Sequence, residues 1–374
     1  MSEWKKTTLG GFISLQRGHD LPYHERRAGK IPVIGSGGVT GLHDSAAVSG
    51  PGITIGRAAN LGVPTLIEED FWPLNTTLYV TDFHGNDIRF AYYLLRTLDF
   101  TGFNSGSVQP MLNRNYIKDI PIVIPDRKEQ EAVSAILGAL DDKIGVNDRI
   151  ASTYEDLLRT LFAELRIDVE SDPSSAVATS DFVDFNPTLK VPRDSEAVYL
   201  DMAAVPTDRA MVSEWTRREP KSGTRFANGD TVMARITPCL ENGKTAFIDF
   251  MEDDEVGIGS TEFIVMRARP GISIYFPYFL ARSPRFRANA VQNMVGSSGR
   301  QRVSAAQIID FPITRPDSEM LSIFDKTADM AFAHLRSLTD ESGNLAELRD
   351  KLLPKLMSGE IRVRDVEKVI EDVT

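Results

Sequence analysis

Hydrophobic residues recur at alternating steps of four and three along residues 126–165, and this spacing predicts one long amphipathic helix. The positions are Val133, Leu137, Leu140, Ile144, Asn147, Ala151, Tyr154, Leu158, Leu161 and Leu165. Such a heptad seam is typical of a coiled coil, and Asn147 is its strongly polar member. Two prolines precede it in residues 119–125, so we expect the helix to begin after Pro125 with Asp126 as its N-cap.

The same pattern occurs again 191 residues further along the chain. At this shift residues 116–125 (YIKDIPIVIP) align with residues 307–316 (QIIDFPITRP), and five of the ten residues are identical. The shift also places on a second seam Phe324, Ala328, Ala331, Leu335, Leu338, Leu345, Leu352 and Leu356, with Ser342 and Arg349 as weaker members. We therefore expect two long helices, and the simplest partner for each helix is the other.

The segments before the two helices are similar to each other in element order. Strand, strand and helix patterns occur at residues 53–57, 71–80 and 88–98, and again at residues 231–235, 260–265 and 276–282. The sequence thus predicts an α+β protein, with two mixed α/β lobes and two long helices in a tandem repeat. The expected domains are 1–125 (first lobe), 126–170 (central helix and linker), 171–316 (second lobe) and 317–374 (second helix and acidic tail).

Charge is distributed unevenly along the chain. The net charge is −11, which by itself argues against a nucleic-acid binder. However, residues 1–125 hold 11 basic and 11 acidic side chains, and residues 263–309 hold seven arginines and no acid. The excess of acid lies on the two helical stretches, so the lobes have room for local basic patches.

Several other functions find no support in the sequence. The longest apolar runs are about nine residues, short of the roughly 18 that a membrane span needs. The single cysteine, Cys239, excludes internal disulfides and cysteine-cluster zinc sites. The glycines at 35–38 lack the Gly-Lys-Ser/Thr of a phosphate loop, and His19 and His24 lack HExxH spacing. We expect a cytoplasmic protein that is not an enzyme by itself.

Longer motifs point to a family. Residues 229–247 (GDTVMARITPCLENGKTAF), the segments IPVIGSGG, GPGITIGR and FWPLNTTLYV of the first lobe, IPIVIPDRKEQEAV before the first helix and LLPKLMSGEI after the second carry the resemblance. With these motifs the chain resembles the specificity (S, or HsdS) subunit of type I restriction–modification systems over residues 4 to about 364.

The resemblance implies a division of labour between subunits. Each lobe would be a target-recognition domain that reads one half of a split site in double-stranded DNA. The helices would pack antiparallel, set the spacing between half-sites and dock the partners. Family members assemble with two methyltransferase subunits, which use S-adenosylmethionine to methylate adenine, and with restriction subunits. This chain would bind no cofactor itself.

Candidate DNA-binding residues combine hydrogen-bond donors and acceptors in turns after strands. They are Arg57, Asn60, Asn75, Thr76, Ser107 and Gln109 in the first lobe, and Arg235, Thr237, Glu241, Asn242, Lys244, Arg282, Arg285, Arg287, Arg300 and Gln301 in the second. Each of them has an alternative role as an ordinary surface or turn residue. Arg96 and Arg282 occupy equivalent positions in the two lobes, and this symmetry could equally reflect a structural salt bridge that each of them makes in its own lobe. Asn147 either fixes the register of the helices or faces solvent.

Two hypotheses compete with DNA recognition. In one, the chain is a protein scaffold whose lobes bind other proteins, and sequence-specific, salt-dependent DNA binding would distinguish it. In the other, the chain is a fused methyltransferase, which its length and lack of cofactor motifs disfavour.

Overall fold

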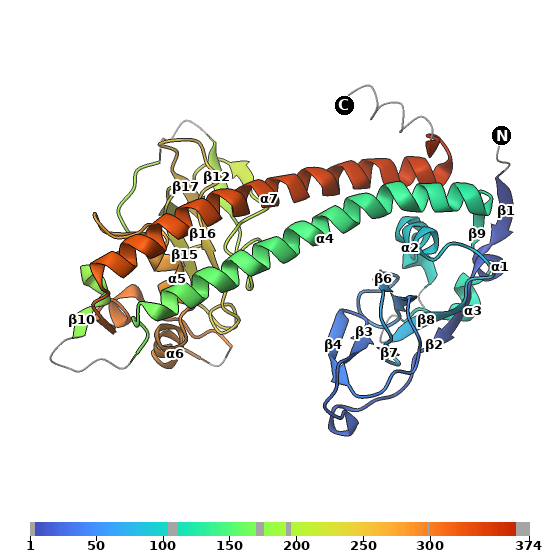
Figure 1. Ribbon diagram of the computed structural model, residues 1–374, viewed down its shortest axis with the longest axis horizontal. Coiled ribbons are helices and arrows are strands. Elements are labelled where there is room, and N and C mark those ends of the chain that lie inside the picture. The colour runs from blue at the N-terminus through green and yellow to red at the C-terminus, as the bar shows by residue number, and fades with distance from the viewer. Residues whose placement is uncertain (1–3, 104–110, 170–175, 192–195, 298, 364–374) are drawn as a thin grey trace. The chain divides into compact units, whose positions relative to one another are not determined.

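The computed structural model describes residues 4–103, 111–169, 176–191, 196–297 and 299–363. The chain divides into two compact units, the first formed by residues 1–143 and 345–374 and the second by residues 144–344. Each unit holds one lobe together with parts of the two long helices, α4 (Arg127–Glu164) and α7 (Ser318–Ser358) (Figure 1).

Both long helices begin at an aspartate cap. The Asp126 carboxylate accepts the N–H of Glu129 (3.0 Å), and the Asp317 carboxylate accepts the N–H of Glu319 (2.9 Å) and of Met320 (3.0 Å). The two caps lie 191 residues apart, so the N-cap prediction at Asp126 is confirmed and extends to the second helix.

The two helices run antiparallel where they pack together in the second unit. Asn147 of α4 donates to Ser342 of α7 (3.2 Å), and the Tyr154 hydroxyl hydrogen-bonds the His334 ring (3.1 Å). A later position on α4 therefore meets an earlier position on α7. At its other end α7 continues through Pro354 to Ser358, and Gly359 follows with φ +73°.

The first lobe contains nine strands and three short helices among its described residues. The strands are β1 (Lys5–Thr8), β2 (Ser14–Arg17), β3 (Ile31–Gly35), β4 (Gly38–His43), β5 (Gly52–Gly56), β6 (Pro64–Ile67), β7 (Trp72–Pro73), β8 (Thr77–Asp82) and β9 (Pro121–Ile124). The helices are α1 (Leu9–Phe12), α2 (Ile88–Thr97) and α3 (Arg114–Ile117), with 3-10 turns at Tyr23–Glu25 and Thr101–Phe103.

These strands form an antiparallel sheet in the order β2-β8-β5-β6 and a smaller sheet in the order β4-β3-β7, where β3 and β7 are parallel. β1 pairs with β9, so the start of the lobe lies beside the segment that leads into α4. The core joins Phe12 and Phe90 to Leu137 of α4 and Leu356 of α7, which fixes the helix ends to the lobe.

The second lobe contains ten strands among its described residues. They are β10 (Ala176–Ala178), β11 (Val183–Phe185), β12 (Ala197–Leu200), β13 (Thr216–Arg218), β14 (Thr224–Phe226), β15 (Thr231–Ala234), β16 (Thr245–Phe247), β17 (Gly257–Gly259), β18 (Phe263–Ala268) and β19 (Pro312–Thr314). Its helices are α5 (Phe276–Arg282) and α6 (Pro284–Gln292), with 3-10 turns at Thr179–Asp181 and Ala305–Gln307.

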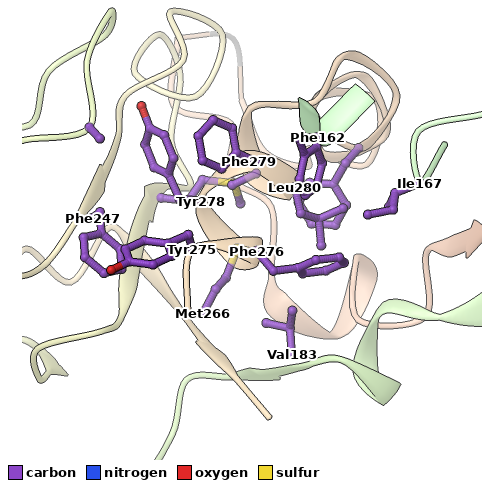
Figure 2. Close-up of a cluster of buried hydrophobic side chains, with 14 of the residues drawn as sticks. Phe162, Ile167, Val183, Phe247, Met266, Tyr275, Phe276, Tyr278, Phe279 and Leu280 are labelled. Atoms are coloured by element: carbon purple, nitrogen blue, oxygen red, sulfur yellow. The ribbon is translucent and has the colours of Figure 1, made fainter. Parts of the chain in front are cut away.

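The second lobe repeats the strand order of the first and adds one strand, β14, to the smaller sheet. Its antiparallel sheet is β11-β18-β15-β16, its other sheet is β13-β12-β17-β14 with β12 and β17 parallel, and β10 pairs with β19 as β1 pairs with β9. Figure 2 shows the core of this unit, where Phe162 of α4 lies among Phe276 and Phe279 of α5. The phenylalanine rings thus attach the second lobe to the long helix.

Two sequence predictions differ from the structure. Residues 71–80 form β7 and β8 in different sheets rather than one strand, because Pro73 ends β7 and a turn follows it. The strand expected at 260–265 begins at Phe263, since the Phe263 N–H closes a turn onto the Ser260 carbonyl oxygen (3.2 Å).

No helix among the described residues has the length and apolar character needed to cross a membrane.

Candidate nucleic-acid interface

Arg57 is the first residue after β5, and hydrogen bonds fix its main chain on both sides. Its N–H donates to the Thr76 carbonyl oxygen (2.9 Å), and its own carbonyl oxygen accepts the Leu112 N–H (2.9 Å). Its Nη1 donates to the Asn75 carbonyl oxygen (3.3 Å). Burial, and then the charge of Arg17, lowers the pKa of Arg57. We call Arg57, Asn75 and Thr76 the first corner.

Arg235 has the same main-chain environment in the second lobe, directly after β15. Its N–H donates to the Glu262 carbonyl oxygen (2.9 Å), and its carbonyl oxygen accepts the Val303 N–H (2.9 Å). The Glu262 carboxylate accepts two bonds from Nε of Arg302 (2.8 and 2.9 Å). We call Arg235, Glu262 and Arg302 the second corner. The two corners are thus equivalent sites in the two lobes, with different side chains around one arginine.

Other predicted residues of the second lobe gather at this second corner. The Thr237 N–H donates to the Gln301 carbonyl oxygen (3.0 Å), and Arg300 is exposed next to Gln301. Glu241 and Asn242 are exposed in the turn that follows Thr237. The corner therefore offers both hydrogen-bond donors and acceptors to solvent, as contacts with base edges and phosphates require.

Four further basic residues predicted to bind DNA in the second lobe fall into two groups. Lys244 donates to two neighbouring main-chain carbonyl oxygens (2.7 and 3.2 Å), and Arg282 donates to another (3.0 Å). The main-chain N–H of Arg285 donates to the Asp168 carboxylate (3.1 Å), and its guanidinium group donates to the Val169 carbonyl oxygen. These three side chains hold loops of the lobe, whereas Arg287 is exposed.

In the first lobe the predicted residues are placed less uniformly. Asn60 is exposed in a left-handed turn with φ +35°. Asn75 donates its side-chain amide to the Asp20 carboxylate. Ser107 and Gln109 lie outside the described residues.

Sequence reasoning missed two arginines beside the first corner. Arg17 and Arg114 line one cleft together with Arg57. Arg114 stands in the motif Asn-Arg-Asn shortly after the Gly/Ser loop, so a search for cations that flank this loop could have found it. Arg17 could not be found this way, because its place depends on the pairing of β2 with β8.

The predicted seam of the helices is buried or half-buried throughout, namely at Leu137, Leu140, Ile144, Asn147, Leu158, Leu161, Leu335, Leu338, Leu345 and Leu352. Asn147 is 1% exposed and donates to Glu341 (2.8 Å) and Ser342 (3.2 Å). The solvent-facing alternative for Asn147 is therefore wrong. Arg96 pairs with Asp350 of α7 (3.3 Å), which supports a structural role for this arginine.

In the part of the chain that the structure describes, no group of three or more His, Cys, Asp or Glu side chains is arranged to hold a metal ion.

The sequence is similar to known proteins. Residues 1–153 match the family model of the type I restriction modification DNA specificity domain. The specificity subunit of the type I restriction enzyme EcoAI from Escherichia coli is 30% identical over 168 residues, which are 42% of this chain and 27% of that subunit. The MjaIX specificity subunit from Methanocaldococcus jannaschii is 22% identical over 307 residues, 74% of this chain and 70% of that subunit.

A solved structure has the same fold. The type I restriction–modification S subunit from M. genitalium superposes with a TM-score of 0.60 at 15% identity, over 95% of this chain and 96% of that one. The matches to the EcoAI and EcoEI subunits of E. coli span about a quarter of their length, 27% and 24%.

The fold is that of a two-lobed protein with long helices, and the predicted fold class is confirmed. Residues 1–153 are similar to the type I restriction modification DNA specificity domain, and the relatives that match parts of the chain are named as specificity subunits. The relatives are named as specificity subunits, in agreement with the expectation that this chain is not an enzyme by itself.

Proposed function

We propose that this chain is the DNA specificity subunit of a type I restriction–modification complex, in which each lobe reads one half of a split DNA site. The observation that carries the proposal is the equivalence of the two corners. Arg57 and Arg235 have the same main-chain hydrogen bonds, while the residues around them differ. Two readers of this kind on one chain suit a site with two different halves.

The long helices would set the distance between the half-sites and dock the partners. α4 and α7 contain 38 and 41 residues, which correspond to about 57 and 62 Å at the usual helical rise. Two methyltransferase subunits, which would carry S-adenosylmethionine, and restriction subunits are the proposed partners, and the complex would act on cytoplasmic DNA. The proposed functional domains are residues 1–125 and 171–316, with the helical regions 126–170 and 317–374 between and after them.

The test is to map adenine methylation on DNA exposed to this chain and its co-encoded methyltransferase. We expect a split motif, with two short specified halves and a fixed gap. Replacing residues 181–306 by those of another family member should then change one half only. A single continuous motif would contradict the two-reader proposal. No methylation, with a methyltransferase that is active alongside another specificity subunit, would favour the protein scaffold.

A further inference from the structure

A polar cleft opens beside the first corner. It is lined by Gln16, Arg17, Gly18, His19, Asp20, Arg57, Leu78, Asn113 and Arg114. The segment that begins with Arg17 at the end of β2 and continues to Asp20 is held close to the main chain at the end of β7. The His19 N–H donates to the Pro73 carbonyl oxygen (2.8 Å), and a Cβ on Gly18 would lie 2.2 Å from the carbonyl oxygen of Leu74. The wall of the cleft is therefore fixed in position by backbone contacts.

The cleft holds more positive than negative charge. Three guanidinium groups line it, and Asp20 is the one carboxylate among its lining residues. Asp20 lies 4.0 Å from Arg17 and also accepts the Asn75 amide. Arg57 and Arg114 each donate one hydrogen bond to a main-chain carbonyl oxygen (3.3 Å each), which leaves the charge of both guanidinium groups without a carboxylate partner among the described residues. Burial, and then the nearby charge of Arg17, lowers the pKa of Arg57. The chain has a net charge of −11, so this local excess of positive charge is unusual and suits the binding of an anion from another molecule.

The second corner has a smaller excess of positive charge. Its Glu262 occupies the place of Thr76, and the Glu262 carboxylate neutralises Arg302 through bonds of 2.7 to 2.9 Å. Ala305 stands two residues after Val303, as Arg114 stands two residues after Leu112. The same site of the fold therefore holds three arginines and one carboxylate in the first lobe, and two arginines and one carboxylate in the second.

We propose that the cleft formed by Arg17, Arg57 and Arg114 binds a phosphate of the DNA backbone, and that Arg235 and Arg302 of the second corner form no equivalent cleft. The proposal rests on the proposed DNA-specificity function and assigns the first corner an anchoring role in it. Guanidinium groups match phosphate oxygens in geometry as well as charge. A phosphate contact positions the lobe on the duplex, and the neighbouring side chains are left to read bases.

The experiment measures binding of the full chain to a fluorescent duplex of mixed sequence between about 50 and 200 mM KCl. We expect R17A and R114A each to reduce the slope of log K against log salt by about 0.9, the value for one lost phosphate contact. Both side chains are exposed, so the variants should fold, and thermal unfolding checks this. R17K and R114K keep the charge and should retain most of the slope. K128A, on α4 outside the cleft, is the control for loss of one charge.

The possible outcomes distinguish failure of the phosphate-site proposal from failure of the proposed DNA-specificity function. If the wild-type chain shows no salt-dependent DNA binding, the proposed function fails. If it binds with a clear slope that R17A and R114A leave unchanged, or reduce no more than K128A does, the phosphate site is wrong. Because guanidinium groups match phosphate oxygens, inorganic phosphate should displace the duplex more strongly than KCl at equal ionic strength, and R17A should reduce this difference. Equal displacement by the two salts in the wild-type chain would show that the cleft does not prefer phosphate and would overturn the proposal.

Discussion

In the first lobe Arg57 directly follows strand β5 and lies next to Thr76. In the second lobe Arg235 directly follows the equivalent strand β15 and lies next to Glu262. The main-chain hydrogen bonds of Arg57 and Arg235 are the same in both places. The surroundings differ, because Glu262 is paired with Arg302 while Arg57 faces two further arginines. The comparison shows that the main-chain hydrogen bonds keep the backbone of the two corners alike. The side chains at these corners take no part in those bonds and can therefore differ.

The interiors of the lobes differ as well. In the second lobe Asp230 is 0% exposed, and both of its carboxylate oxygens accept bonds from Arg267 (2.7 Å each). Counted from the corners, the equivalent positions of the first lobe are Gly52 and Thr81, which cannot form an ion pair. The two sheets share their strand order but differ in how the strands are joined by side chains.

The largest effect is therefore expected from D230A, which leaves the Arg267 guanidinium without its partner. Breaking a buried pair costs about 3–5 kcal/mol, and because Arg267 is 34% exposed we expect a value near 3 kcal/mol. Hydrogen exchange should become faster in β15 and β18 but not in β5 and β8.

The control for this prediction is D184A in the same sheet. Asp184 and Arg269 are each 46% exposed, so the loss should be about 0–1 kcal/mol. Equal protection of β15 and β18 in D230A and wild type would show that the ion pair does not stabilise the second lobe.

A smaller effect is expected on the helix seam, where Asn147 stands at the position that Leu338 occupies in the repeat. Leucine at 147 cannot donate to Glu341 and Ser342, and loss of a donor in a buried site costs about 1–3 kcal/mol. Urea unfolding followed by circular dichroism measures this. V146L, a partly exposed neighbour on α4, should change stability by no more than about 0.5 kcal/mol. If N147L matches wild type in stability and in assembly with its partners, Asn147 has no role in register.

The two units also differ in the carboxylate of α4 that accepts a hydrogen bond from a buried tyrosine. The Tyr93 hydroxyl donates to Asp141 (2.6 Å), which also accepts from Arg349 (2.7 Å). The Tyr278 hydroxyl donates to Glu155 (3.2 Å), which is 4% exposed. Burial raises the pKa of Glu155 above its ordinary value of 4.5, despite the hydrogen bonds and nearby cations that lower it.

This difference predicts a pH dependence for the second unit. Between 4.5 and the raised pKa of Glu155, the folded chain binds more protons than the unfolded chain, so stability falls as pH rises through this window. E155Q keeps an oxygen that can accept the Ala210 N–H and removes the titration, so its stability should fall less over the same range. Unfolding measured at several pH values tests this. D141N is the contrasting variant and should weaken the first unit at neutral pH, since it removes one of the two carboxylate partners of Arg349 and leaves Asp350. Parallel pH profiles for E155Q and wild type would contradict the role of Glu155.

The long helices and their caps could be predicted because their signals are local. Asp126 and Asp317 follow prolines and cap helices through residues two to three positions away, so a single shift of 191 residues found both helices. The seam followed from the heptad spacing, and the structure buries it as expected.

The corners could be predicted only in part, because they depend on contacts between distant segments. Arg57 and Arg235 were found as cations after strands, but their partners Leu112 and Val303 come from loops more than fifty residues away. The cleft beside Arg57 also needs Arg17, which strand pairing brings there. The structural contacts of Lys244, Arg282 and Arg285 have the same long-range origin, so the sequence could not separate them from exposed cations.

The smallest effect is expected from R300A in the second lobe. Arg300 is exposed next to Gln301, and its side chain is a candidate for one phosphate contact. Its loss should weaken DNA binding a few-fold and lower the salt slope by about 0.9, whatever the DNA sequence. R269A removes one charge from an exposed ion pair with Asp184 and serves as the control. A change in R300A no larger than in R269A would remove Arg300 from the interface. Phosphate anchoring would then depend on the first lobe, which would sharpen the contrast between the two corners.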